Sequence, residues 1–149
     1  INNSDNTILN YCLDITLSKV PKKIIDSFES NGWTISLDNK NILDDNIAGI
    51  TCYTRKYIYI SNDYFDIINS TIHEIGHYVD FDNMFISESD EWKRIYSIEK
   101  YNANINDYCK STSQEFFAEM FLQTILFPNK CKNQTPMAYE YMIQLISTY

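Results

Sequence analysis

The stretch His73-Glu74-Ile75-Gly76-His77 holds both histidines of this 149-residue chain, and it lies inside a segment whose apolar residues recur at helical spacing. Positions i and i+4 of an α-helix lie one above the other on the same face. Both imidazoles could therefore reach one ion at the distance of about 2.0 to 2.1 Å that zinc–nitrogen bonds require. The spacing of the two histidines predicts half of a zinc site.

Glu74 lies between the two histidines and is expected to project beside the ion rather than onto it. A carboxylate in that place can accept a proton from the attacking water. His73, Glu74 and His77 together form the His-Glu-x-x-His arrangement that is typical of zinc peptidases. The alternative interpretation is a pair of surface histidines on a helix that binds no metal.

The residues before this helix predict a small sheet. Residues 18–30 have helical spacing, with Ser18 as a plausible cap, and end at Asn31-Gly32. Residues 33–37 and 50–60 alternate apolar and polar side chains, as half-buried strands do. We expect these strands to form a small antiparallel sheet, with a turn near Arg55-Lys56.

The residues from position 62 onward predict mainly helices. The histidine helix is expected to begin at a cap, Asn62 or Asp63, and to run past Val79. Its predicted buried stripe consists of Phe65, Ile68, Ile72, Ile75 and Val79. Three more helices are expected: one from Ser87 through Glu99 with Trp92, Ile95 and Ile98 inward, one capped by Ser111, Thr112 or Ser113 and ending at Phe127, and one opened by Thr135-Pro136. The fold class is therefore α+β, with a sheet in the N-terminal half and a mostly helical C-terminal half.

The composition predicts a single domain over residues 1–149. A net charge of −8 argues against a nucleic-acid partner or an anionic membrane surface. No apolar run approaches the roughly 18 residues that a transmembrane helix needs. The four cysteines have no zinc-ligand spacing and are expected to be free thiols packed as small hydrophobic residues.

A catalytic zinc site needs a third protein ligand, and the chain has no third histidine. The candidates are Asp80, Glu115, Glu119 and Cys109. Asp80 follows His77 on the same helix, and three ligands along one straight helix form a ridge that cannot supply three corners of a tetrahedron. We expect Asp80 to support an imidazole or a partner side chain by hydrogen bonding. The alternatives are that Asp80 is an ordinary polar residue at the end of the helix, or that it is a zinc ligand.

Glu115 and Glu119 interrupt an apolar helix, Gln114-Glu115-Phe116-Phe117-Ala118-Glu119-Met120-Phe121. Carboxylates buried among phenylalanines are costly unless a charge neutralises them, and a zinc ion would do so. We expect Glu115 to be the third ligand and Glu119 to support a histidine. The exchange of these two roles is the main alternative.

Together these motifs resemble a known family. The histidine motif with the following Tyr78-Val79-Asp80, and Tyr108 seven residues before Glu115, are similar to the catalytic domain of anthrax lethal factor and of its relatives, the secreted Pro-Pro endopeptidases of clostridia and bacilli. The resemblance covers residues 64–127. It implies a zincin-like fold and a gluzincin-like metalloendopeptidase that holds one zinc ion and acts on proteins or peptides.

The resemblance also implies roles for single residues. His73, His77 and Glu115 would bind the zinc ion, and Glu74 would be the general base. Tyr108 would lie over the oxygen on which negative charge develops. The protein would be a secreted bacterial enzyme or toxin, and we expect it to be a monomer.

An extended substrate could add as a strand to a sheet edge beside the metal. Ala48-Gly49-Ile50-Thr51, the strand nearest before the histidine helix, is the candidate for that edge. A purely structural strand is the alternative. For the whole chain, the competing interpretations are a non-catalytic zinc-binding or partner-binding lobe of a larger bacterial toxin and a structural α+β domain. Whether Pro-Pro bonds, kinase tails or other segments are cleaved stays open.

Overall fold

A computed structural model describes residues 3–38, 43–44 and 46–149 of the chain. The chain forms two compact units, residues 1–74 and 75–149. The boundary falls inside one continuous helix, α3 (Tyr64–Asp82), so the two units share this helix. His73 and Glu74 therefore end the first unit, and His77 lies one helical turn later, in the second unit.

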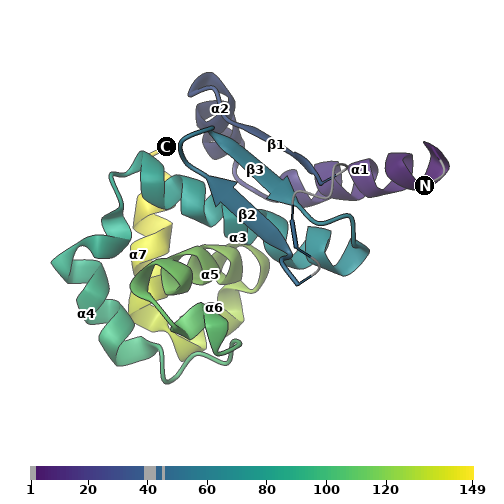
Figure 1. Cartoon of the computed structure of the whole chain (residues 1–149). Coiled ribbons are helices and arrows are strands. Elements are labelled where there is room, and N and C mark those ends of the chain that lie inside the picture. The colour runs from purple at the N-terminus through teal and green to yellow at the C-terminus, as the bar shows by residue number, and fades with distance from the viewer. Residues whose placement is uncertain (1–2, 39–42, 45) are drawn as a thin grey trace. The chain divides into compact units, whose positions relative to one another are not determined.

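The first unit contains two helices and a three-stranded sheet in addition to the start of α3 (Figure 1). These elements are α1 (Asn3–Leu17), α2 (Lys22–Ser30), β1 (Thr34–Leu37), β2 (Gly49–Cys52) and β3 (Tyr57–Ile60). The strand order is β1-β3-β2. Strand β2 therefore lies at one edge of the described sheet.

The sheet is mixed, whereas we expected it to be antiparallel. Strands β2 and β3 form the expected antiparallel hairpin, and its turn includes Lys56 at φ 51°. Strand β1 instead pairs with β3 in parallel, with Leu37 opposite Ile60. Alternation of apolar and polar residues predicts a strand but not the direction of its neighbour, which explains the error. The α+β class itself is confirmed.

Two helical details of the first unit differ from the prediction. Helix α1 was not anticipated, and α2 begins only after Pro21. The Ser18 hydroxyl donates to the carbonyl oxygen of Ile15, so Ser18 belongs to the end of α1 and does not cap α2. The predicted end of α2 is confirmed, because Gly32 adopts φ 79° there and lets the chain turn into β1.

Helix α3 begins where a cap was predicted. The Asp63 carboxylate accepts hydrogen bonds from the backbone N–H groups of Phe65 and Asp66. Ile72, Ile75 and Val79 are fully buried, as expected. Phe65 is 71% exposed, contrary to the prediction, and Ile67 is buried near that end of the helix instead. The first turn of a helix can extend past the core that covers its later turns, and spacing alone does not show this.

The second unit is helical, as predicted, and begins with the last turns of α3 (Figure 1). Its elements are the 3₁₀ turn η1 (Ile86–Glu88), α4 (Asp90–Glu99), the 3₁₀ turn η2 (Tyr108–Lys110), α5 (Ser113–Leu126), α6 (Pro128–Gln134) and α7 (Pro136–Ser147). Helix α6 was not anticipated. Its opening proline stands at the first helical position, where the missing N–H costs nothing, so Pro128 starts a helix as well as ending α5.

Trp92 anchors the packing of α4 against α5. Its side chain is fully buried, its ring meets that of Phe117 at 5.0 Å between centroids, and its indole N–H donates to the Ser113 carbonyl oxygen at 3.0 Å. Ile95 is also buried, but Ile98 is 48% exposed, contrary to the prediction. No helix among the described residues is long and apolar enough to cross a membrane.

Candidate active site

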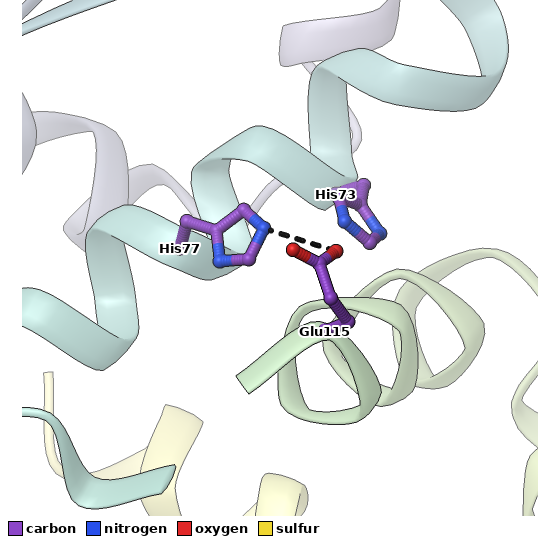
Figure 2. A group of neighbouring side chains, drawn as sticks. All are labelled: His73, His77 and Glu115. Carbon is purple, nitrogen blue, oxygen red and sulfur yellow. Dashed lines mark ion pairs between the residues drawn. The ribbon is translucent and has the colours of Figure 1, made fainter. Parts of the chain in front are cut away.

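The two histidines lie on adjacent turns of α3, and their side chains are largely buried. Both point toward Glu115, which comes from the first turn of α5 (Figure 2). The distance between His77 Nε2 and Glu115 Oε2 is 3.5 Å. One ligand atom from each of the three residues lies within 4.8 Å of the other two. The structure thus brings together the three residues that were predicted to bind zinc.

These distances fit a zinc ion. Ligand bonds of about 2.0 to 2.2 Å in a tetrahedron place neighbouring ligand atoms about 3.4 Å apart. The separation of His77 Nε2 and Glu115 Oε2 is close to this edge length. Two imidazoles and one carboxylate also form a ligand set that zinc peptidases use, and they leave a fourth position for water or substrate. The donor atoms present therefore suit one zinc ion.

The beginning of α5 explains the position of Glu115. The Thr112 side chain accepts a hydrogen bond from the Glu115 backbone N–H at 3.1 Å and caps the helix. Glu115 is the third residue after this cap, where glutamate often reaches back to the cap residue. Here its carboxylate points toward His77 instead. Helix capping fixes the backbone and leaves the carboxylate for the site.

Gly76 allows α3 and α5 to approach closely within the second unit. A Cβ atom at position 76 would lie 2.8 Å from the Cα and 2.9 Å from the carbonyl oxygen of Ala118. Real Cβ atoms do not come so near to backbone atoms. The glycine inside the histidine motif is therefore required by the contact that brings Glu115 opposite His77.

Glu74 is held by strand β2, within the first unit. The Thr51 hydroxyl donates to Glu74 Oε2 at 2.6 Å, and Thr51 Oγ1 also lies 3.2 Å from the Glu74 backbone carbonyl oxygen. Gly49 lies against the side chain of Glu74. Among the four residues predicted to bind substrate, Ala48, Gly49, Ile50 and Thr51, two thus contact the predicted general base. Their contact with a substrate stays a prediction.

Tyr108 and Cys109 are neighbours in η2, and each contacts one of the two glutamates of α5. The Tyr108 hydroxyl donates to Glu115 Oε1 at 3.1 Å, while 66% of the residue remains exposed. The Cys109 thiol donates to Glu119 Oε2 at 3.4 Å. The predicted role of Tyr108 at the reacting oxygen stays a prediction, but its hydroxyl lies beside a predicted zinc ligand.

The Glu119 carboxylate contacts Gln123 and lies near His73 and Cys109. Gln123 Nε2 donates to its Oε1 at 2.8 Å, and one of its oxygens lies within 4.8 Å of a nitrogen of His73 and of the Cys109 sulfur. Burial, together with the Glu119 charge, raises the pKa of the Cys109 thiol. The thiol therefore stays protonated and acts as a hydrogen-bond donor to Glu119.

Asp80 is fully buried and binds Ser87, at the start of the second unit. Its carboxylate accepts hydrogen bonds from the Ser87 backbone N–H and from the Ser87 hydroxyl, both at 2.7 Å. Burial raises the pKa of the Asp80 carboxyl, and the Ser87 hydrogen bonds and the nearby His77 imidazole offset part of that rise. The Asp80 carboxylate thus fixes the chain after α3, where Met84 and Phe85 both adopt positive φ. Its expected support of an imidazole at the site stays a prediction.

Replacing Asp80 by alanine is expected to lower the free energy of unfolding by about 3 kcal/mol, because a buried backbone donor and a buried hydroxyl lose a charged acceptor. Asp80→Asn keeps an acceptor for the backbone N–H and should cost less. Urea unfolding of the zinc-free proteins measures both. Equal stability of Asp80→Ala and wild type would contradict this role.

The stability contributed by Asp80 should depend on pH. Because the pKa of the Asp80 carboxyl is raised in the folded protein, its protonated form is favoured on folding. The advantage of wild type over Asp80→Asn should therefore shrink as pH rises through the folded pKa.

The comparison with protein families decides the family of this chain. The family model described as "Anthrax toxin lethal factor, N- and C-terminal domain" matches residues 54–145, which is more than half of the chain. The chain belongs to this family. The resemblance inferred from the histidine motif and from the Glu115 segment is thereby confirmed, and both motifs lie within the matched residues.

A solved structure shares the fold of this chain. The PRO-PRO endopeptidase PPEP-2 from Paenibacillus alvei is similar to this chain with a TM-score of 0.72 and 23% sequence identity, over 97% of this chain and 91% of that chain. At this identity the similarity establishes a shared fold. The comparison with curated proteins found no match.

Proposed function

We propose that this chain is a zinc-dependent endopeptidase that hydrolyses peptide bonds in extended protein segments. The observation that carries the proposal is the convergence of His73, His77 and Glu115, with Glu74 held on the helical turn between the histidines. Membership of the lethal factor family and a fold shared with a Pro-Pro endopeptidase support it. A buried ligand set without a neighbouring base would instead suit a structural metal site.

The proposed mechanism assigns one task to each residue. His73, His77 and Glu115 would hold the zinc ion, which supplies Lewis-acid polarisation of the scissile carbonyl and of the attacking water. Glu74 accepts the proton of that water during attack and delivers it to the leaving amine. Tyr108 turns its hydroxyl from Glu115 to the oxyanion of the tetrahedral intermediate, a contact that strengthens as charge develops.

The substrate would bind as an added strand along the outer edge of β2. Strand β2 ends the sheet order, so no strand among the described residues pairs with its far edge. Such pairing recognises backbone rather than sequence. Because the similar solved structure is a Pro-Pro endopeptidase, substrates containing Pro-Pro bonds are the first to test. Export from the cell, a monomeric state and a single domain over residues 1–149 remain predictions from the sequence.

Removal of the metal is expected to abolish cleavage. Purified protein should contain about one zinc ion per chain. It should cleave members of a peptide library that includes Pro-Pro sequences and sequences from the terminal tails of proteins. Dialysis against a chelator should stop cleavage, and added zinc should restore it. Mass spectrometry of the products, with elemental analysis of the same samples, measures both properties.

The same experiment separates the competing functions. Zinc without any cleavage would favour a non-catalytic lobe of a larger toxin. Protein that binds no zinc would leave only a structural α+β domain and would reject the proposal. Cleavage that survives complete removal of zinc would reject the proposed mechanism.

A further inference from the structure

Strand β2 turns two of its residues toward the predicted general base. Gly49 pairs with Ile60 and Thr51 pairs with Ile58 in the antiparallel register, and directly opposed residues share one face of a sheet. Ile58 and Ile60 are fully buried. Gly49 and Thr51 therefore face the interior of the first unit, where α3 presents Glu74.

Both of these residues lie close to the Glu74 carboxylate. Thr51 Oγ1 lies 2.6 Å from Oε2, the length of a strong hydrogen bond to a charged acceptor. A Cβ atom at Gly49 would lie 2.9 Å from Cγ and 3.0 Å from Oε1 of Glu74. The hydroxyl thus holds one oxygen, and the absent side chain of Gly49 makes room for the rest of the carboxylate.

Such an arrangement matters because glutamate is flexible. Its side chain has several rotatable bonds, whereas a general base must stay within hydrogen-bond reach of the proton that it takes. A misplacement of about 1 Å can cost about a hundredfold in rate. A donor fixed on a strand restrains Oε2 and leaves Oε1 to receive the proton.

We propose that Thr51 is a positioning residue that orients Glu74 for catalysis through its hydroxyl. This inference rests on the proposed endopeptidase function, because it assigns Glu74 a catalytic task. One strand then has two functions. Its outer edge binds the substrate backbone, and its inward face sets the position of the base.

Thr51→Val tests the proposal, because valine keeps the shape of threonine and removes only the hydroxyl. We expect kcat to fall about 10- to 100-fold, the effect of losing one hydrogen bond to a charged group, with KM changed less than about threefold and zinc content unchanged. Thr51→Ser restores the hydroxyl and should recover kcat to within about threefold of wild type. Thr34→Val makes the same change at an exposed position of β1 and controls for the loss of a hydroxyl in the sheet.

A second measurement does not depend on turnover. In protein labelled with ¹³C at the glutamate side-chain carboxyl, the resonance that disappears in Glu74→Gln identifies Glu74. This resonance should shift in Thr51→Val and return close to its wild-type position in Thr51→Ser. If the wild-type protein cleaves no peptide, the proposed function fails while this measurement still decides whether Thr51 holds Glu74.

Two results would overturn the inference. One is a Thr51→Val variant with wild-type kcat and an unmoved Glu74 resonance. The other is a fall in kcat that Thr51→Ser does not reverse, since that would show a packing effect of the methyl-bearing side chain rather than of its hydroxyl.

Discussion

Glu74→Gln is expected to lower kcat about a thousandfold while the protein keeps its fold and its zinc ion. Glutamine has the size of glutamate, and its amide oxygen can still accept the hydrogen bond of the Thr51 hydroxyl. The amide cannot take a proton from water at neutral pH. The substitution therefore removes general-base chemistry and leaves His73, His77 and Glu115 in place.

Three measurements on one preparation test this expectation: peptide cleavage followed by mass spectrometry, zinc content by elemental analysis, and thermal unfolding. Glu140→Gln makes the same chemical change at an exposed position of α7 and should leave all three unchanged. A Glu74→Gln protein that keeps more than about a tenth of wild-type kcat would show that another group takes the proton.

The grouping of the three proposed zinc ligands could be predicted from the sequence because its constraints are local or chemical. Helical periodicity places His73 and His77 on one face, whatever the rest of the fold does. Glu115 was found by a second argument, the cost of a carboxylate in an apolar helix. The structure brings these three residues together, although α5 follows α3 only after an intervening helix and two 3₁₀ turns.

The contacts that position the site depend on pairings between distant segments. The Thr51 hydroxyl reaches Glu74 because β2 pairs with β3 in one particular register. A shift of one residue would turn Thr51 to the opposite face of the sheet. The sequence pattern predicted a strand near residue 50 but not that register. Thr51 was therefore expected to contact substrate rather than the base.

The sequence did not identify Ser87 as the partner of Asp80, or Glu119 as the partner of Cys109, for a related reason. Asp80 was considered mainly by its place on the ligand face, yet its carboxylate turns to the chain that follows α3 and binds Ser87. Cys109 was expected to pack as a small hydrophobic residue, and it is indeed buried and free. Its hydrogen bond to Glu119 could not be read from the spacing, because a short 3₁₀ turn at η2 sets its direction.

Gly76 carried a signal that spacing arguments overlooked. A glycine inside a helix costs about 1 kcal/mol relative to alanine, so its presence indicates a packing or functional reason. The structure supplies that reason in the contact with Ala118.

Gly76→Ala is expected to destabilise the protein and to weaken zinc binding together. Alanine gains about 1 kcal/mol of helix propensity, but its Cβ would lie 2.8 Å from the Ala118 Cα. Backbone atoms inside α5 cannot move aside as the end of a side chain can, so α3 and α5 must separate. Overpacking of this kind costs about 1 to 3 kcal/mol or more. We expect a net loss of about 1 to 2 kcal/mol in the zinc-free protein.

The effect on zinc follows from the same displacement. Glu115 lies on α5 and His77 on α3, with 3.5 Å between their ligand atoms. A shift of a few tenths of an ångström between the helices moves these atoms away from tetrahedral spacing, so we expect zinc affinity to fall at least about tenfold. Competition against a zinc-binding dye measures the affinity, and urea unfolding of zinc-free protein measures the stability.

Two controls make the result specific. Ser70→Ala on the same helix gains helix propensity without the contact at Ala118, and it should change stability by less than about 0.5 kcal/mol. Adding Ala118→Gly to Gly76→Ala should not rescue the protein, because the Cβ at position 76 meets the backbone of residue 118 rather than its methyl group. A Gly76→Ala protein that is more stable than wild type would show that propensity outweighs the clash, and the closeness of α3 to α5 would then not explain the glycine in the histidine motif.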